Sequence, residues 1–356
     1  MRVAILGVGL IGGSVGLAAR QRLGAFVTGH DPDPEAMRVG LDVGALDAAG
    51  TLAEAVADAD VAVVGAPVGR IPEVVEAVLR HAGPDTIVTD VGSAKGAIVA
   101  AVDDRRFVGG HPLAGAETAG VRHAREDLFA GAPWYLTPRS GSSGVVFERL
   151  TRFLAGLGAR PQAIEAATHD RLMASISHVP HVIANVLVAQ AAVVLADDGT
   201  LPATGPSFRD ATRVAGANTT MWTDIYLANR DALVDRLDDV VHRLQTVRAD
   251  LVAGDAAAIA GWNDAARADR EALLAVGLAG GTAPSCELRV AVPNRPGVVA
   301  DVALALGHAG INIHDMTLSP SDDERTGEVA LWVDADGASR AAELVAGLGL
   351  RVEGAP

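Results

Sequence analysis

Short apolar runs rich in Val and Ile alternate with longer Ala- and Leu-rich helical stretches through the first third of the chain. Each run is expected to form a strand, at residues 2–6, 25–29, 61–65, 87–90 and 107–109. Strands that alternate with helices predict βαβ units and a doubly wound parallel sheet with helices on both faces. One more helix, 145–156, and strand, 159–164, are predicted after a flexible stretch, so this domain is expected to span residues 1–165.

The pattern becomes all-helical between residues 166 and 276. Apolar positions at helical spacing predict helices at 168–176, 180–196, 221–229 and 230–253. Residues 277–284 are rich in Gly and Ala, which is typical of a flexible linker.

A third, compact unit is expected at residues 285–356. Its predicted strands and helices are 287–292, 297–309, 311–318, 328–333, 339–348 and 350–353, in chain order. The order βαββαβ is the ferredoxin-like arrangement. The expected fold class is therefore α/β, with a parallel-sheet domain, an all-helical domain and a ferredoxin-like domain.

The most apolar segment is residues 182–196, which Asn185 and Gln190 interrupt. It is shorter than the roughly 20 residues that a membrane span requires. An apolar helix in a protein without a membrane needs a protein surface to cover it, so we expect a homodimer. The N-terminus lacks the charged start and long apolar stretch of a signal peptide, so a cytoplasmic protein is expected.

Composition narrows the function classes. The chain has 356 residues and a net charge of −15, which argues against a general nucleic-acid-binding surface. Its single cysteine, Cys286, excludes an intrachain disulfide and a metal site built on cysteines, and a reducing compartment fits best. Aromatic residues make up only 3%, so Ala, Val and Leu must fill the cores.

A glycine-rich turn follows the first predicted strand and opens a helix. Gly7, Gly9 and Gly12 form the pattern G-x-G-x-x-G. In this context the three glycines permit the tight turn, the approach of a pyrophosphate and close helix–strand packing. The first helical amides, at Leu10 and Ile11, would then bind the phosphates. An ordinary strand–helix turn is the alternative.

Asp31 ends the second predicted strand, close to the roughly 20-residue spacing expected for an acid at the ribose diol. Asp33 and Glu35 follow it and would repel a 2′-phosphate, so NAD is expected rather than NADP. A helix cap is the alternative role for Asp31. Pro67 is expected to shape the loop under the adenosine half, or to be an ordinary turn proline.

Three further segments carry a family resemblance. They are TDVGSAKG at 89–96, GGHPLAG at 109–115 and SHVPH at 177–181, and together with GLIGGS at 9–14 they resemble the prephenate/arogenate dehydrogenase family of tyrosine biosynthesis. The tail from Ser285 resembles an ACT domain, an amino-acid-sensing module. The resemblance implies a Rossmann-type NAD domain, a helical dimerisation domain and the NAD-dependent oxidative decarboxylation of prephenate to 4-hydroxyphenylpyruvate and CO2.

The resemblance also implies roles for residues of the first domain. His111 would accept the proton of the substrate hydroxyl, and an unperturbed imidazole is mostly neutral at pH 7, as a base must be. Ser93 would orient the substrate hydroxyl and the nicotinamide, with capping of the next helix as the alternative. Glu117 would lie at the pocket mouth. Lys95 would support the cofactor loop or be solvated.

In the helical domain, His181 would reach the substrate pocket and His178 would support it. Their spacing is compatible with a metal site, but no third ligand motif accompanies them, so no metal is expected. Arg213 would bind a substrate carboxylate, because its planar guanidinium gives two parallel bonds. Asp210 would hold that guanidinium, with a surface ion pair as the alternative. Trp222 would form an apolar pocket wall or pack in the core.

In the ACT-like tail, Asn294, Gly297 and Asn312 are candidate contacts for a regulatory amino acid. L-Tyrosine is the expected effector because it is the end product of the implied pathway. A dimerisation module without a ligand is the alternative.

Other functions stay open. L-Arogenate differs from prephenate only in its side-chain ammonium, so an arogenate dehydrogenase is the first alternative. A non-catalytic NAD and amino-acid sensor is the second. A different hydroxyacid dehydrogenase would share Gly7, Gly9 and Gly12 but leave the other three segments unexplained. The family resemblance leads us to expect a hydroxyl residue of some relatives at the position of Ala116, so a pocket hydrogen bond would be missing here.

Overall fold

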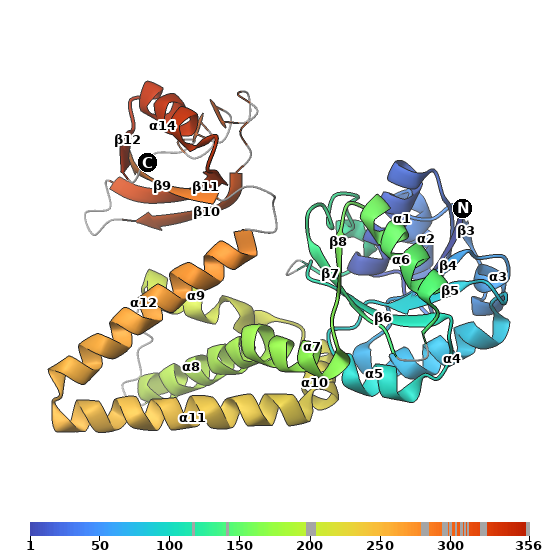
Figure 1. The fold of residues 1–356 in the computed structure, drawn as a ribbon, viewed down its shortest axis with the longest axis horizontal. Helices are drawn as coiled ribbons and strands as arrows, with labels where there is room; N and C mark the ends of the chain where they lie inside the picture. The colour runs from blue at the N-terminus through green and yellow to red at the C-terminus, as the bar shows by residue number, and fades with distance from the viewer. Residues whose placement is uncertain are drawn as a thin grey trace. The chain divides into compact units, whose positions relative to one another are not determined.

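The computed structural model describes residues 1–115, 118–139, 142–196, 204–278, 285–293, 298, 301–302, 305–306, 309, 311, 313–320 and 326–353. The chain divides into two compact units, residues 1–246 and 247–356, and each is described by itself. Figure 1 shows the elements of both units in chain order.

An eight-stranded sheet organises the first unit, with strand order β3-β2-β1-β4-β5-β6-β7-β8. Its strands are β1 (Arg2–Leu6), β2 (Phe26–His30), β3 (Ala48–Ala49), β4 (Val61–Val64), β5 (Ile87–Asp90), β6 (Phe107–Pro112), β7 (Pro133–Thr137) and β8 (Arg160–Ala163). The predicted Rossmann-type parallel sheet is confirmed, except that β7 runs antiparallel to β6. β3 and β7 were not predicted from the sequence pattern.

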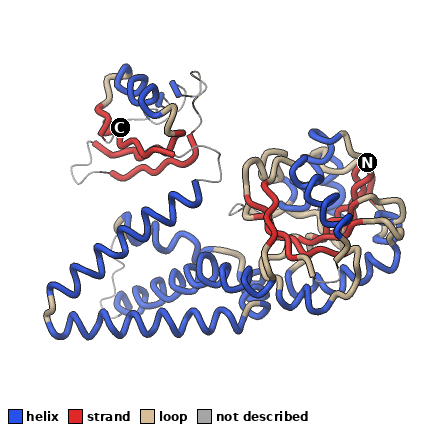
Figure 2. The backbone as a smooth tube through the Cα atoms, in the orientation of Figure 1, coloured by secondary structure: helices blue, strands red, loops and turns tan. Residues whose placement is uncertain are grey.

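Helices cover both faces of this sheet (Figure 2). One core lies under α1 (Leu10–Leu23), α2 (Pro34–Asp42) and α6 (Gly144–Gly156), and the other under α3 (Leu52–Val56), α4 (Ile71–His81) and α5 (Gly96–Ala101). Side chains of β1 contribute to both cores, because Val3 and Ile5 point to one face of the sheet while Ala4 and Leu6 point to the other. A strand buried on both faces reads as a continuous apolar run, which is why β1 was recognised.

β6 is longer than predicted. It continues to Pro112 because β7 pairs with its second half, and His111 lies opposite Tyr135 in that ladder. His111 is therefore held within the strand rather than in the loop after it. The paired strand fixes the backbone of His111 on both sides, which a loop would not do.

The predicted helices of the middle region are confirmed as α7 (Ala166–Met173), α8 (Val179–Ala196), α10 (Thr219–Ala228) and α11 (Arg230–Ala253). A π-helical turn, η3 (Ala174–His178), joins α7 to α8 without a break. Two further helices, α9 (Pro206–Thr212) and α12 (Ala256–Leu278), were not predicted from the sequence pattern. Because α12 reaches Leu278, the first residues of the predicted linker are helical, and 279–284 lie outside the described residues.

The continuous helical stretch at residues 166–193 is long and apolar enough to cross a membrane by length and composition. A third of its most apolar window is buried inside the protein. It also carries His169, Asp170 and His178, which are all buried and hydrogen-bonded within the protein. These contacts hold the first part of the stretch against the rest of the protein.

In the second unit, β9 (Ser285–Pro293), β10 (Ile313–Pro320), β11 (Thr326–Asp334) and β12 (Arg351–Glu353) form an antiparallel sheet of order β10-β11-β9-β12. This is the predicted ferredoxin-like arrangement. Its core contains side chains of α14 (Ala338–Gly347) and a buried stripe, Val298, Val302 and Leu306, from the first predicted helix. The candidate ligand residues Asn294, Gly297 and Asn312 lie outside the described residues.

Candidate functional site

The glycine-rich turn between β1 and α1 has the backbone that its sequence predicted. Gly7 has a φ of 105°, and a Cβ there would lie 2.5 Å from the carbonyl oxygen of Gly65. A Cβ on Gly12 would lie 2.1 Å from the carbonyl oxygen of Gly7. A Cβ on Gly9 would meet nothing within 4 Å. Packing therefore explains Gly7 and Gly12, whereas Gly9 leaves open space beside the helix start.

That open space leaves the backbone at Gly9 accessible to a group such as a pyrophosphate. Gly9 is the N-cap of α1 and offers no side-chain cap, so the amides of Leu10 and Ile11 lack partners within the helix. Such amides bind anions well. Ser14, in the first turns of α1, is fully buried, and its hydroxyl accepts a hydrogen bond of 3.0 Å from the amide of Arg125.

Asp31 lies beside the same turn, just after the end of β2. Its carboxylate accepts hydrogen bonds from the amides of Val8, at 2.7 Å, and Asp33, at 2.9 Å. The capping role belongs to Asp33, whose side chain accepts from the amide of Glu35 at the start of α2. Two backbone amides thus fix the Asp31 carboxylate beside the glycine-rich turn. Pro67 is exposed and directly precedes η1 (Val68–Arg70).

Ser93 lies in the loop between β5 and α5. Its Oγ is shielded from solvent and has no hydrogen-bond partner among the residues that the structure describes. It does not cap α5, whose N-cap is Lys95 without a side-chain bond. Burying a hydroxyl without a hydrogen-bond partner costs free energy, so this hydroxyl is well placed to hydrogen-bond a bound molecule.

Lys95 is fully buried rather than solvated. Its ammonium forms an ion pair with Asp90, which is equally buried, and donates a 2.9 Å hydrogen bond to the carbonyl of Gly110. The amides of Gly92 and Gly110 also donate to Asp90, at 2.8 and 3.1 Å. Burial lowers the pKa of Lys95, and Asp90 opposes that shift. The pair thereby connects β5, the loop after it and Gly110 of β6, which directly precedes His111.

His111 forms the first link of a chain of polar side chains. Its Nδ1 lies 2.9 Å from Nε2 of His169, and Nδ1 of His169 lies 2.9 Å from Oδ1 of Asp170. Asp170 also accepts 2.7 Å hydrogen bonds from the amides of Lys95 and Gly96. Burial, followed by the charges of His169, Lys95 and His178, lowers the pKa of His111 well below its ordinary value. His111 is therefore neutral at pH 7.

A second polar cluster surrounds His181 at the start of α8. The imidazole of His181 stacks on the indole of Trp222, with ring centroids 3.6 Å apart and planes within 5°. Its Nδ1 contacts the hydroxyl of Tyr226 and lies 3.2 Å from Nδ2 of Asn185. Burial lowers the pKa of His181, against the opposing effect of the Val214 backbone.

His178 supports this region from the interior. Its Nδ1 lies 3.1 Å from Nδ2 of Asn229, which also donates 2.8 Å to the carbonyl of Asp170. Burial lowers the pKa of His178 to about 4. Its ring meets Trp222 edge-on at 6.1 Å. The two clusters therefore meet at His178.

The predicted cation site lies beside His181. Arg213 begins η4 (Arg213–Gly216), which packs against α8, and its side chain is exposed. Asp210 is exposed on α9, and within the described part of the chain its carboxylate joins no ion pair, so the predicted Asp210–Arg213 pair is not observed. Glu117 lies outside the described residues. Among those described, no group of three or more His, Cys, Asp or Glu side chains could hold a metal ion.

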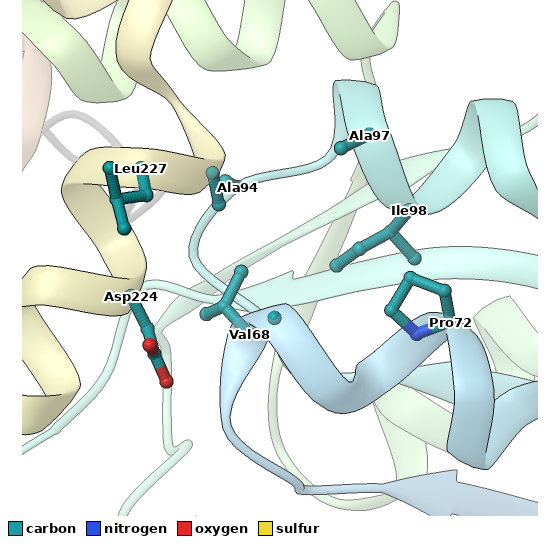
Figure 3. Close-up of a pocket in the computed structure, with 9 residues that line it drawn as sticks. Val68, Pro72, Ala94, Ala97, Ile98, Asp224 and Leu227 are labelled. Carbon is teal, nitrogen blue, oxygen red and sulfur yellow. The ribbon is translucent and has the colours of Figure 1, made fainter.

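An apolar cavity of about 240 Å³ lies next to the Ser93 loop, between η1, α4, α5 and α10 (Figure 3). Among the described residues that line it, Asp224 is the one with a carboxylate. None of the residues predicted from the sequence lines it. The lining residues are Val68, Gly69, Pro72, Ala94, Ala97, Ile98, Asp224, Leu227 and Ala228.

Comparisons with known proteins identify the family. Residues 15–163 match the family model of the prephenate dehydrogenase nucleotide-binding domain, 165–262 the prephenate dehydrogenase dimerization domain and 287–346 the ACT domain. The prephenate dehydrogenase of Bacillus subtilis is 30% identical over 355 residues, which cover 96% of this chain and 94% of that protein. The chain belongs to the prephenate dehydrogenase family.

Solved structures agree. A prephenate dehydrogenase from Aquifex aeolicus, in complex with hydroxyphenyl propionate and NAD+, matches with a TM-score of 0.72 and 26% identity, over 77% of this chain and 98% of that one. An arogenate dehydrogenase from Synechocystis matches with a TM-score of 0.67 and 28% identity, over 77% of this chain and 100% of that one. The predicted family, fold class and NAD-dependent dehydrogenase class are confirmed. The individual site residues stay predictions.

Several residues of the site escaped the sequence analysis. His169 and Asp170 stand side by side in the predicted helix 168–176, and this adjacent His-Asp pair was the available signal. No sequence pattern marked Tyr226, Asn185 or Asn229. Each is a polar residue on or at the end of a helix, and only the folded structure places it beside a histidine.

Proposed function

We propose that this chain is an NAD-dependent prephenate dehydrogenase, which converts prephenate to 4-hydroxyphenylpyruvate and CO2 in L-tyrosine biosynthesis. The observation that carries the proposal is the neutral, hydrogen-bonded His111 on β6, close to the buried hydroxyl-bearing loop of Ser93. Strands β5 and β6 are neighbours, so both residues lie at the carboxyl edge of the sheet, where ligands bind in such folds.

The cofactor would be held by the turn between β1 and α1. The amides of Leu10 and Ile11 would bind the pyrophosphate in the space beside Gly9, and Asp31 would accept from the ribose hydroxyls. When bound, NAD supplies the acceptor for the hydride that leaves C4 of the substrate.

His111 acts on the hydroxyl at C4. Its neutral imidazole takes the hydroxyl proton as hydride leaves the same carbon and the ring carboxylate departs as CO2. The ring becomes aromatic, and His111 returns the proton to the phenolate oxygen, so no proton is gained or lost overall. Ser93 donates to or accepts from the same oxygen and holds it toward His111. General base catalysis of this kind contributes about 10²–10⁴-fold.

The substrate carboxylates need cations and donors on the helical side. Arg213 would bind one carboxylate through two parallel charge-assisted bonds. His181 would donate to the side chain of the substrate, with Trp222 as the apolar wall behind it. Asp210 and Glu117 would complete the rim of the pocket.

The test is NADH formation, followed by absorbance, with prephenate and L-arogenate in parallel. Faster turnover of prephenate is expected. Faster turnover of arogenate would leave the proposed roles of His111 and the cofactor site unchanged. It would also require an acid, not yet identified, that binds the substrate ammonium. His111→Asn should lose about 10²–10⁴-fold in rate and keep its NAD affinity. Turnover of neither substrate would overturn the proposal in favour of a non-catalytic sensor.

The proposed assembly is a cytoplasmic homodimer. Val186, Leu187 and Val193 of α8 are large apolar side chains exposed to solvent, and a second copy would cover them. A stable monomer at micromolar concentration in light scattering would contradict this. The proposed domains are residues 1–165, 166–276 and 285–356.

L-Tyrosine is the proposed effector of the ACT domain. Millimolar L-tyrosine should inhibit the enzyme or raise the melting temperature of the full chain. If it does neither, the domain has another ligand or only a structural role.

A further inference from the structure

We propose that His169 and Asp170 are positioning residues, which hold His111 in the tautomer whose Nε2 carries the reactive lone pair. His111, His169 and Asp170 form a hydrogen-bonded relay that runs from β6 into α7. The base role of His111 rests on the proposed function, whereas the tautomer is a property of the protein alone.

The inner end of the relay is a fixed carboxylate. Asp170 accepts from the amides of Lys95 and Gly96, both at 2.7 Å, and it is mostly buried. Burial raises the pKa of Asp170, but the hydrogen bonds from His169, Lys95 and Gly96 outweigh burial and hold that pKa below its usual value. An ionised carboxylate can only accept hydrogen bonds. Nδ1 of His169, 2.9 Å from Oδ1, must therefore carry a proton.

This assignment propagates to His111. A neutral imidazole has one N–H and one bare nitrogen, so Nε2 of His169 is an acceptor. It lies 2.9 Å from Nδ1 of His111, which must then donate. The remaining nitrogen of neutral His111, Nε2, is left with its lone pair. A doubly protonated His169 would instead donate to Nδ1 of His111 and leave the proton of neutral His111 on Nε2, which the first experiment below detects.

Packing holds the relay in place. His169 is fully buried, and its ring meets Tyr135 edge-on at 5.8 Å and His111 edge-on at 5.1 Å. Tyr135 is the partner of His111 in the β6–β7 ladder. The charged or titratable groups that act on His111 are His169 on α7, Lys95 before α5 and His178 on η3. None of these three is an acid, and among the described residues Asp170 is the carboxylate that the relay places behind His169.

A purely structural reading is available for each member. Asp170 would be only a clamp on the start of α5, and His169 only a core side chain. These structural roles and the relay all predict that substitution lowers the stability of the protein. Only the relay predicts that the protonated nitrogen of His111 changes when His169 is replaced.

The first experiment reads that nitrogen directly in the full-length protein without ligands. ¹⁵N NMR of the histidine-labelled chain at pH 7 should show His111 with a protonated Nδ1 and a bare Nε2. His169→Gln keeps an acceptor near the former Nε2 and should preserve this tautomer. His169→Phe removes the acceptor and should shift His111 toward protonation at Nε2. His81→Gln, at the exposed end of α4, is the matched control and should change nothing.

The second experiment is kinetic. His169→Phe should lower kcat on the order of 10²-fold, with KM for prephenate nearly unchanged, because a misoriented base slows chemistry rather than binding. His169→Gln should recover at least about a tenth of the wild-type kcat, since orientation survives without the link to Asp170. With His111→Asn already present, His169→Phe should cost less than about twofold, because residues that act as a unit are not additive.

The outcomes separate the relay from the proposed function. A protonated Nε2 in the wild-type protein, an unchanged His111 tautomer in His169→Phe, or a full further loss of rate in the His111→Asn background would overturn the relay. The predicted tautomers without turnover of prephenate or arogenate would leave the relay standing and overturn the proposed function. If His169→Phe does not fold, His169→Gln remains as the test. The relay predicts that this variant keeps the His111 tautomer and at least about a tenth of the wild-type kcat.

Discussion

The buried pair of Lys95 and Asp90 gives the sharpest prediction about stability. Both side chains are fully buried, and Lys95→Met would keep the length of the side chain while removing its charge. Asp90 would retain the amides of Gly92 and Gly110 but lose its counter-charge. Removing one partner of a buried ion pair typically costs 3–5 kcal/mol, so we expect a loss of about 4 kcal/mol in the free energy of unfolding.

The double variant decides whether that cost comes from the charge. Asp90→Asn together with Lys95→Met leaves two neutral side chains of similar volume, and such replacements are often close to neutral. We therefore expect the double variant to recover at least about 2 kcal/mol of the loss. The control is Arg70→Met, which removes an exposed partner of Glu73 and should change stability by less than about 1 kcal/mol.

Urea unfolding, combined with hydrogen exchange of peptides that cover β5 and β6, is the appropriate assay. A chain with several domains need not unfold in one step, and exchange reports the affected strands directly. A loss below about 1 kcal/mol for Lys95→Met would refute the reasoning, because it would mean that water reaches Asp90 once Lys95 is gone. If the single and double variants lose the same free energy of unfolding, the cost comes from altered packing and not from the unpaired charge of Asp90.

Three further predictions follow from single observations. Lys95 is the only lysine in the sequence and is fully buried, so an amine-reactive reagent should label only the N-terminal amine of the native protein, and labelling of Lys95 under native conditions would contradict its burial. Because burial and neighbouring charges lower the pKa of His111, kcat/KM should stay high as pH falls to 6.5 and decline only below it, whereas a half-maximal point above pH 7 would contradict this. Gly12→Ala should destabilise the protein by about 1–3 kcal/mol through its 2.1 Å approach to Gly7, while Gly9→Ala should leave thermal stability unchanged and weaken NAD binding in calorimetry.

The pattern of apolar residues was sufficient to predict the elements whose burial is visible in their own sequence. The central strands β1, β4 and β5 are buried on both faces, so their apolar runs were visible without any knowledge of their partners. The helix α11 was predicted to the residue, and the ferredoxin-like order of the tail followed from alternation in β9 and β11.

Periodicity failed where a neighbour decides the conformation. β7 has the sequence PWYLT, bounded by prolines, and becomes a strand because β6 and β8 pair with it on either side. The extension of β6 to include His111 has the same cause. α9 is too short for a helical pattern to emerge, and it follows residues that the structure leaves undescribed.

The sequence by itself determined the family, the cofactor class and the glycine turn, because those depend on residues that act locally and in order. Gly7 and Gly12 are required by backbone clashes within one strand–helix turn, which a linear motif can encode. The protonation pattern of the site was decided only by tertiary structure. His111 lies on β6, whereas His169 and Asp170 are neighbours on α7, 58 residues after His111 in the case of His169. A tautomer is set by the atom that faces each ring nitrogen. That information exists only once β6 and α7 are packed together.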